Sequence, residues 1–373
     1  MQQQLISPEL LQKSDKILFV AHLALGDFTY MQNCFRAFAR AYPHIRMHLW
    51  VDEVRRTPDE SKWPHLKKYA LYDWVRATGM FERIYDQTYS PQFYKESIVQ
   101  AQAENYPIVV SFAVLVRHLY AELVRKLSPH GFVVAQKKRV RLFDIRKHLA
   151  YRKLDAFIPA YKSSELRGEH ISALYASWFQ QLFGITTSAH ERFPYVDIPA
   201  VWQQRAQEDL ETQGVPQGAR LVFLNAFSKS DERSWPLERM FELSQRMRQT
   251  PAWRDAWFVV NVVPEKMDQA RRMLAKSKLE NVTLFSAEEN FFQLPAVLSL
   301  CSLIVSVETA VMHLANAVHV PVIALMRQTS PEWVPIDTAN STIISVKSRK
   351  GWITEIEVDE VLACVVARES LGV

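Results

Sequence analysis

Residues 302–326 read SLIVSVETAVMHLANAVHVPVIALM, and this stretch decides the fold. Its apolar runs over 302–307 and 320–326 predict buried strands, and the segment between them, 309–318, has the period of a helix. Two buried strands joined by a helical crossover run parallel, because the crossover returns the chain to the same end of the sheet. The stretch therefore predicts an α/β protein built on parallel sheets.

The rest of the chain repeats this alternation. Further strands are predicted at 16–23, 45–51, 83–86, 107–112, 131–135, 220–225, 257–263 and 282–285. Further helices are predicted at 28–42, 64–78, 114–127, 170–183, 202–212, 236–248, 265–276, 291–300 and 355–368. Each half thus predicts its own doubly wound, Rossmann-like sheet, and such sheets bind ligands at the carboxyl ends of their strands. We expect two such domains facing each other across a cleft that holds the site.

The length of 373 residues suits two domains of about 150 to 200 residues each. The junction is expected near 186–200, a segment with two prolines and little periodicity. We therefore expect an N-terminal domain over 1–190, a linker region over 191–218 and a C-terminal domain over 219–355. The final helix, 356–373, could pack back on the N-terminal domain.

The chain is mildly basic, with a net charge of +5, and the excess is local. The run Lys137-Lys138-Arg139-Val140-Arg141 is followed by Arg146, Lys147, Arg152 and Lys153. This concentration favours an anionic partner, such as a phosphorylated glycan or an anionic membrane surface, although a solvated loop and helix face would have the same composition. No segment has the form of a nucleic-acid-binding module, so no nucleic acid partner is expected.

Three further features indicate a cytoplasmic protein. Cys34, Cys301 and Cys364 lie far apart and without metal-ligand spacing, so neither a metal site nor a disulfide is predicted. The N-terminal segment lacks the basic and apolar regions of a signal peptide. Polar residues interrupt the longest apolar stretch, 294–326, which argues against a spanning helix. We expect a soluble or peripheral protein.

The first candidate site follows the predicted strand 16–23. The sequence Leu25-Gly26-Asp27-Phe28 forms a glycine turn that leads directly into a helix. Asp27 in this position is equally well explained as a helix cap or as a general base, because the positive end of the helix dipole favours an ionised carboxylate. His22, on the same strand, is more typical of a packed histidine.

A second candidate site follows strand 302–307. Glu308 and Thr309 stand where the helix begins, and the free N–H groups of a helix N-terminus can hold a diphosphate. His313 lies one turn further along, on the same face as Thr309. A buried core histidine, together with a carboxylate that interacts only with the helix dipole, would produce the same pattern.

A third polar segment, NAFSKSDERSWP over 225–236, links a strand to a helix. Its hydroxyls and cations could neutralise a leaving phosphate, although such loops are common.

In their order and spacing, these three segments resemble the heptosyltransferase family, the ADP-heptose-using glycosyltransferases of lipopolysaccharide core assembly, which have the GT-B fold. The matching stretches are Leu25-Gly26-Asp27, Arg233-Ser234-Trp235-Pro236 and Glu308-Thr309-Ala310-Val311-Met312-His313-Leu314-Ala315. The resemblance extends over most of the chain.

The resemblance implies an inverting, metal-independent transfer of heptose from ADP-heptose onto a lipopolysaccharide-core or related glycan, with Asp27 as general base. The implied partners are an ADP-linked nucleotide-sugar donor, with no separate cofactor, and an anionic glycolipid acceptor, with peripheral contact to the inner membrane. The residues it assigns to donor and nucleotide binding are Ser228, Lys229, Arg233, Glu308, Thr309 and His313. Those expected on the acceptor side are Gly26, Lys137, Lys138, Arg139 and Arg141.

Three departures from the family pattern leave the donor open. Glu308 replaces the usual aspartate, Ala310 the usual glycine, and Arg327-Gln328 the usual Gly-Pro. A different nucleotide sugar, or a non-catalytic binding subunit of the same fold, therefore stays an alternative. An NAD-linked oxidoreductase is disfavoured because no G-x-G-x-x-G follows any predicted strand.

Overall fold

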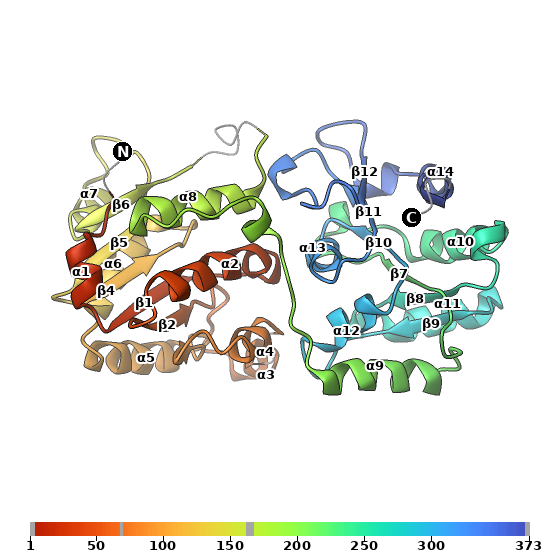
Figure 1. Cartoon of the computed structure of the whole chain (residues 1–373), viewed down its shortest axis with the longest axis horizontal. Coiled ribbons are helices and arrows are strands. Elements are labelled where there is room, and N and C mark those ends of the chain that lie inside the picture. The colour runs from red at the N-terminus through yellow and green to blue at the C-terminus, as the bar shows by residue number, and fades with distance from the viewer. Residues whose placement is uncertain (1–3, 68–69, 162–167, 370–373) are drawn as a thin grey trace. The chain divides into compact units, whose positions relative to one another are not determined.

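A computed structural model describes residues 4–67, 70–161 and 168–369 of the chain. The chain divides into two compact units, Met1–Arg192 and Phe193–Val373, a division two residues after the expected end of the N-terminal domain. Each unit contains a parallel six-stranded sheet with helices packed on it (Figure 1). The predicted α/β class with two doubly wound domains is confirmed. Residues 68–69 of the predicted helix 64–78, and the last four residues of the predicted C-terminal helix, lie outside the described residues.

Unit 1 has the strand order β3-β2-β1-β4-β5-β6, and every neighbouring pair is parallel. Its strands are β1 (Lys16–Ala21), β2 (Arg46–Val51), β3 (Arg83–Tyr85), β4 (Ile108–Ser111), β5 (Phe132–Lys137) and β6 (Ala156–Pro159). Its described helices are α1 (Pro8–Lys13), α2 (Leu25–Ala41), α3 (Trp63–Lys67), α4 (Ala70–Ala77), α5 (Pro91–Ala103), α6 (Arg117–Leu127), α7 (Ile145–Tyr151) and α8 (Ile171–Phe183). The winding reverses between β1 and β4, so the carboxyl ends of these two strands form the expected ligand position.

Unit 2 has the equivalent order β12-β11-β10-β7-β8-β9, again all parallel. Its strands are β7 (Leu221–Asn225), β8 (Trp257–Asn261), β9 (Val282–Phe285), β10 (Leu303–Val307), β11 (Val322–Met326) and β12 (Ser341–Ser345). Its described helices are α9 (Ala200–Thr212), α10 (Leu237–Met247), α11 (Met267–Ser277), α12 (Gln293–Ser299), α13 (Ala310–Ala317) and α14 (Val358–Glu369). Here the winding reverses between β7 and β10.

Two strands that the sequence analysis missed, β6 and β12, are edge strands. Both expose alternate residues, so neither contains the continuous apolar run that identifies a central strand. β1, by contrast, is buried at every residue after Lys16. Helices α1, α5 and α7 were also missed, because α1 and α7 are short and α5 buries only Ser97, Ile98 and Ala101.

Aromatic packing fixes α2 and α8 against β1. Phe19 of β1 is fully buried, and its ring lies 5.1 to 6.1 Å, between centroids, from five other phenylalanine rings. These are Phe35 and Phe38 of α2, Phe112 after β4, and Phe179 and Phe183 of α8. Helix α2 is therefore held beside α8, and the first candidate site lies in the N-terminal turn of this helix.

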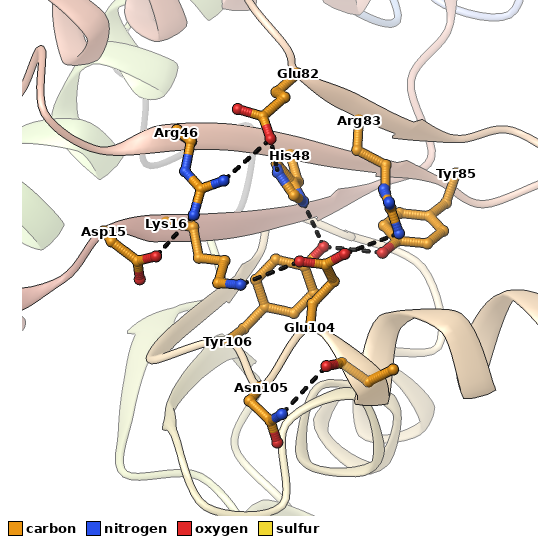
Figure 2. Close-up of polar contacts among 11 residues, drawn as sticks. Asp15, Lys16, Arg46, His48, Glu82, Arg83, Tyr85, Glu104, Asn105 and Tyr106 are labelled. Atoms are coloured by element: carbon orange, nitrogen blue, oxygen red, sulfur yellow. Dashed lines mark hydrogen bonds and ion pairs between the residues drawn. The ribbon is translucent and has the colours of Figure 1, made fainter.

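A network of ion pairs lies along the amino-terminal edge of the unit 1 sheet, opposite the edge at which its strands end (Figure 2). Its cations Lys16, Arg46 and Arg83 are the first residues of β1, β2 and β3. The ion pairs are Lys16 with Glu104 (3.1 Å), Arg83 with Glu104 (2.9 Å), Arg46 with Asp15 (2.7 Å) and Arg46 with Glu82 (3.2 Å). Because the strands are parallel, this edge is remote from their carboxyl ends, and we interpret the network as structural.

The C-terminal helix α14 belongs to unit 2. It packs on α10, and its buried residues Val358, Val361 and Val365 lie in the hydrophobic core of that unit. Its apolar face is thus occupied within its own domain, and the packing of residues 356–373 on the N-terminal domain stays a prediction. Helix α9, from the expected linker 191–218, likewise packs on α12 of unit 2.

Candidate active site

Asp27 lies in the first turn of α2, at the carboxyl end of β1. The helix begins at Leu25, three residues before the predicted start at Phe28, so Asp27 is its third residue and Gly26 its second. The capping position belongs to Ala24, whose N–H donates to Asp27 Oδ2 over 3.0 Å. Asp27 is therefore not the N-cap residue of α2. Its carboxylate instead accepts the backbone N–H of the N-cap residue, so the predicted capping role becomes a supporting contact to that residue.

A second partner of Asp27 comes from a distant helix. The Tyr175 hydroxyl on α8 donates to Asp27 Oδ1 over 2.7 Å. Burial raises the pKa of Tyr175 well above its usual value, and the negative charge of Asp27 adds to this shift. The phenol thus stays protonated and acts as a fixed donor. The sequence offered no signal for this contact, because the two residues are 148 positions apart.

A second carboxylate, Asp52, follows the neighbouring strand β2. Its Oδ2 accepts a hydrogen bond from the Tyr120 hydroxyl (2.6 Å), and its Oδ1 accepts one from Arg56 (2.6 Å). The ring of His22 lies 5.7 Å from that of Tyr120, and burial lowers the pKa of His22, partly opposed by the charges of Asp27 and Asp52. The carboxyl-end edge of the unit 1 sheet thus carries three polar groups. These are the Asp52 carboxylate, which is paired with Arg56, the neutral imidazole of His22, and the Asp27 carboxylate, which two hydrogen bonds orient.

A basic cavity of about 520 Å³ lies in unit 1. Among its lining residues are five cations and one histidine, namely Arg117, His118, Lys138, Arg139, Arg141 and Lys147. Three of the four basic residues assigned to the acceptor side therefore lie together. The fourth, Lys137, does not line the cavity, since its amine lies over the ring of Phe157, 4.5 Å from the centroid. Gly26 is not among the lining residues either.

Arg117 joins this cavity to the Asp27 edge. It is the first residue of α6, and its Nε donates to Gln136 Oε1 on β5 over 3.1 Å. Its positive charge also acts on His22, lowering the pKa of that imidazole further. Unit 1 thus presents an oriented carboxylate and a cationic cavity on neighbouring parts of the same surface.

In unit 2, an amide and hydroxyl network links three neighbouring strands at their carboxyl ends. The Asn225 side-chain amide donates to Ser306 Oγ (3.0 Å) and Thr309 Oγ1 (3.1 Å). Asn261 in turn donates to Asn225 Oδ1 over 2.8 Å. The network lies where the sheet reverses, between β7 and β10, and it fixes the position of the residue that starts α13.

Thr309 is the N-cap of α13, since its Oγ1 accepts the N–H of Val311 over 3.2 Å. Ala310 follows as the first residue of the helix and has no positive φ, so the replacement of the family's glycine strains nothing. His313 is only 3% exposed and packs against the ring of Trp333, with centroids 5.8 Å apart. Thr309 therefore lies at the partly exposed edge, whereas His313 is part of the core beneath it.

Glu308 links two loops at this edge. Its Oε2 accepts the backbone N–H of Arg327, over 3.2 Å, at the end of β11, and Arg327 forms an ion pair with Glu232. Burial raises the pKa of Glu308, although the bond from Arg327 and the nearby charge of Arg233 oppose this shift. Two of the departures from the family pattern, Glu308 and Arg327, thus contact each other.

The loop after β7 combines exposed cations with a buried anchor. Lys229 and Arg233 are exposed, and the N–H of Ser228 is satisfied by Ser234 Oγ over 3.1 Å. Trp235, from the same motif, is 2% exposed, and its Nε1 donates to Ile356 O over 2.9 Å. Trp235 thus anchors the loop to the core of unit 2, while the exposed Lys229 and Arg233 remain available to a ligand.

Comparison with known proteins agrees with this geometry. Residues 164–357, more than half of the chain, match the model of glycosyltransferase family 9 (heptosyltransferase). The chain belongs to glycosyltransferase family 9. It is thus a glycosyltransferase of the heptosyltransferase family, which confirms the resemblance noted in the sequence. No curated protein matches the chain in sequence.

Solved structures show the same fold across nearly the whole chain. A family 9 glycosyltransferase from Veillonella parvula aligns with a TM-score of 0.70 at 14% identity, over 95% of this chain and 96% of that one. E. coli heptosyltransferase WaaC with ADP gives 0.63 at 18% identity, over 95% and 98%. E. coli ADP-heptose lipopolysaccharide heptosyltransferase II gives 0.64 at 14% identity, over 94% and 98%. The predicted GT-B fold is confirmed.

Among the described residues, no cluster of three or more His, Cys, Asp or Glu side chains could hold a metal ion. Nor does any helix there have the length and apolar character needed to cross a membrane.

Proposed function

We propose that this glycosyltransferase transfers heptose from ADP-heptose to a lipopolysaccharide-core or related glycan, with inversion at the anomeric carbon and without a metal ion. Family membership supports the donor class, and the similar WaaC protein has a structure with ADP-2-deoxy-2-fluoro heptose. Asp27 is the general base that removes the proton of the acceptor hydroxyl. The oriented carboxylate of Asp27 at the carboxyl end of β1 carries the proposal.

The hydrogen bonds of Asp27 suit this role. Its Oδ2 and Oδ1 each accept one bond, from Ala24 and from Tyr175, and each oxygen retains a lone pair for the acceptor hydroxyl. A base of this kind needs a fixed position within hydrogen-bond reach of the proton it removes. The hydroxyl then attacks the anomeric carbon from the face opposite the departing ADP.

On the donor side, we assign the diphosphate to the edge formed by Thr309 and the loop after β7. The N-terminus of α13 directs N–H groups and partial positive charge to that edge. Lys229 and Arg233 stabilise the negative charge that develops on the leaving group, which is an electrostatic contribution. The buried His313 then supports this edge through packing.

On the acceptor side, the cationic cavity suits an anionic glycolipid. Arg117, Lys138, Arg139 and Arg141 contact its phosphate or carboxylate groups, and guanidinium groups bind such anions in bidentate fashion. Arg117, whose charge also acts on His22, is then the cation that connects the bound anionic group with the Asp27 edge. We propose that the reaction takes place at the cytoplasmic face of the inner membrane.

The proposed role of Asp27 is tested by replacing this residue alone. Asp27→Ala should lower the rate of transfer by a factor of about 10² to 10⁴, the contribution of a general base, while ADP binding measured by calorimetry stays unchanged. Transfer within about tenfold of wild type would contradict the role of Asp27. A panel of nucleotide sugars identifies the donor, and preferred turnover of another sugar would replace heptose in the proposal. Absence of turnover with every donor, despite ADP binding, would favour the non-catalytic binding subunit.

The matched control is Asp59→Ala in the same unit. Asp59 also interacts with the first turn of a helix, because its carboxylate accepts the N–H of Ser61 over 3.2 Å at the start of a short 3-10 helix. Among the residues that the structure describes, Asp59 contacts none of those in the candidate site. The control should lose little stability and retain full transfer activity, which separates a capping role from catalysis.

A further inference from the structure

The loop and helix after β5 carry exposed apolar residues in one short stretch. Leu142 and Phe143 are 85% and 94% exposed, and Ile145 and Leu149 are 68% and 53% exposed. We call these four residues the apolar tip. Helix α7 contributes only Ala150 and Tyr151 to the core, so its remaining apolar side chains have no packing function within unit 1. Single exposed apolar residues are common, whereas a contiguous group usually marks an interaction site.

The apolar surface continues onto the start of α6. Leu115, Val116 and Leu119 are 53%, 55% and 41% exposed, and α6 packs directly on α7. Val116 also lines the basic cavity, which therefore lies between the two apolar segments. Helix α7 connects β5 to the edge strand β6, at the outer end of the sheet (Figure 1).

Cations surround the apolar tip. The segment 137–153 contains eight Lys and Arg residues and a single acid, Asp144. Asp144 pairs with Lys147, and Lys153 lies 3.8 Å from Glu122. Within the part of the chain that the structure describes, Lys138, Arg139 and Arg141 have no ion-pair partner. Unpaired cations around exposed apolar side chains are typical of proteins that bind anionic membrane surfaces.

We propose that this surface docks unit 1 onto an anionic lipid bilayer. The apolar tip enters the boundary between headgroups and acyl chains, while Lys138, Arg139 and Arg141 contact lipid phosphates. Charge complementarity favours this occupant over a second copy of the chain, because two such cationic surfaces would repel each other. The cavity beside the tip would then open at the headgroup level.

This last consequence rests on the proposed function, in which the cavity holds the anionic part of a glycolipid acceptor. Docking itself does not depend on it. An enzyme bound in this way would meet its acceptor within the membrane surface, and the acceptor's anionic groups would replace bulk lipid phosphates at the cavity cations when the acceptor binds.

Sedimentation with vesicles tests the docking directly. The full chain, without donor or acceptor, should bind vesicles of phosphatidylcholine and phosphatidylglycerol, bind phosphatidylcholine alone weakly, and dissociate as salt rises. The double variant Leu142→Ser/Phe143→Ser should lower the partition coefficient by about tenfold or more, because it removes the two most exposed apolar side chains. The triple variant Lys138→Gln/Arg139→Gln/Arg141→Gln should lower it by about fivefold for each charge removed.

Matched controls are Val99→Ser on α5 and Val201→Ser on α9, since these apolar residues are 64% and 66% exposed outside the patch. They should bind vesicles within about twofold of wild type, and circular dichroism should show that every variant is folded. The proposal would be overturned if the chain bound no vesicles or bound both vesicle types equally. It would also be overturned if the tip variant and the control variants lost vesicle binding to the same extent. Self-association in the absence of lipid that the tip variant abolishes would overturn it as well, because a second copy would then occupy the surface.

Failure of docking can be told apart from failure of the proposed function. Transfer to a soluble, lipid-free glycan acceptor should be unaffected in the tip variant. Vesicle binding without any transfer activity would contradict only the proposed function, and transfer without vesicle binding would contradict only the docking.

Discussion

The hydrogen bond between Tyr175 and Asp27 allows the clearest quantitative prediction, through the substitution Tyr175→Phe. The change removes one oxygen and keeps the buried ring, whose centroid lies 5.3 Å from that of Trp178. It therefore isolates the hydroxyl that holds the general base in the proposed reaction.

The geometry of this hydrogen bond sets the expected loss in the free energy of unfolding. A hydrogen bond to a charged group contributes about 1.5 to 3 kcal/mol to stability. The length of 2.7 Å and the burial of the phenol favour a large contribution, but Asp27 is only partly buried, so water can replace the lost donor. Oδ2 also keeps its bond from Ala24. We expect the free energy of unfolding of unit 1 to fall by about 1.5 to 2 kcal/mol.

Urea denaturation followed by circular dichroism, with the two units fitted as separate transitions, measures this loss. The control is Tyr42→Phe in the same unit, which removes a hydrogen bond to an uncharged acceptor, the carbonyl of Phe183, of 2.9 Å. This neutral bond should contribute about 1 kcal/mol. A loss in Tyr175→Phe no larger than that of the control would refute the charged hydrogen bond.

The same variant separates positioning from structure. Because Tyr175 orients Asp27 and does not touch the reacting atoms, its loss should lower kcat by about tenfold, far less than Asp27→Ala, with ADP affinity unchanged. An unchanged kcat in a folded Tyr175→Phe variant would show that the phenol has no positioning role.

Two further predictions concern the other networks. The hydrogen bond from Lys16, together with the charge of Arg83, lowers the pKa of Glu104 below its ordinary 4.5, so its stabilisation is complete above pH 4.5 and disappears as pH falls through the folded-state pKa. Glu104→Gln should therefore lower stability by about 1 kcal/mol at pH 7 but not at pH 2, and an equal loss at both pH values in urea titrations would contradict this. Thr309→Val removes the N-cap of α13 and the acceptor for Asn225, so the stability of unit 2 should fall by about 1 to 2 kcal/mol and ADP affinity should weaken. The control is Thr212→Val on α9, whose hydroxyl donates to Glu208 O of its own helix, and equal stability losses would remove the special role of Thr309.

The sequence by itself determined the class of fold and the central strands. β1, β7, β10 and β11 are almost entirely buried, and a strand buried on both faces must be a continuous apolar run. The residues that follow such strands, Asp27 and Glu308 with Thr309, could be located for the same reason, since parallel strands all end at one edge. The edge strands β6 and β12 left no comparable signal, because one of their faces meets solvent.

Tertiary structure decided which side chains meet at each site. Tyr175 and Asp27 come together because two phenylalanine rings of α2 and two of α8 pack around Phe19 and hold these helices side by side. Asn225 reaches Thr309 only because β7 and β10 are neighbours in the sheet. Sequence patterns report burial, which depends on each residue's own polarity. Pairing between distant residues depends on how whole elements pack, and a single sequence does not record it.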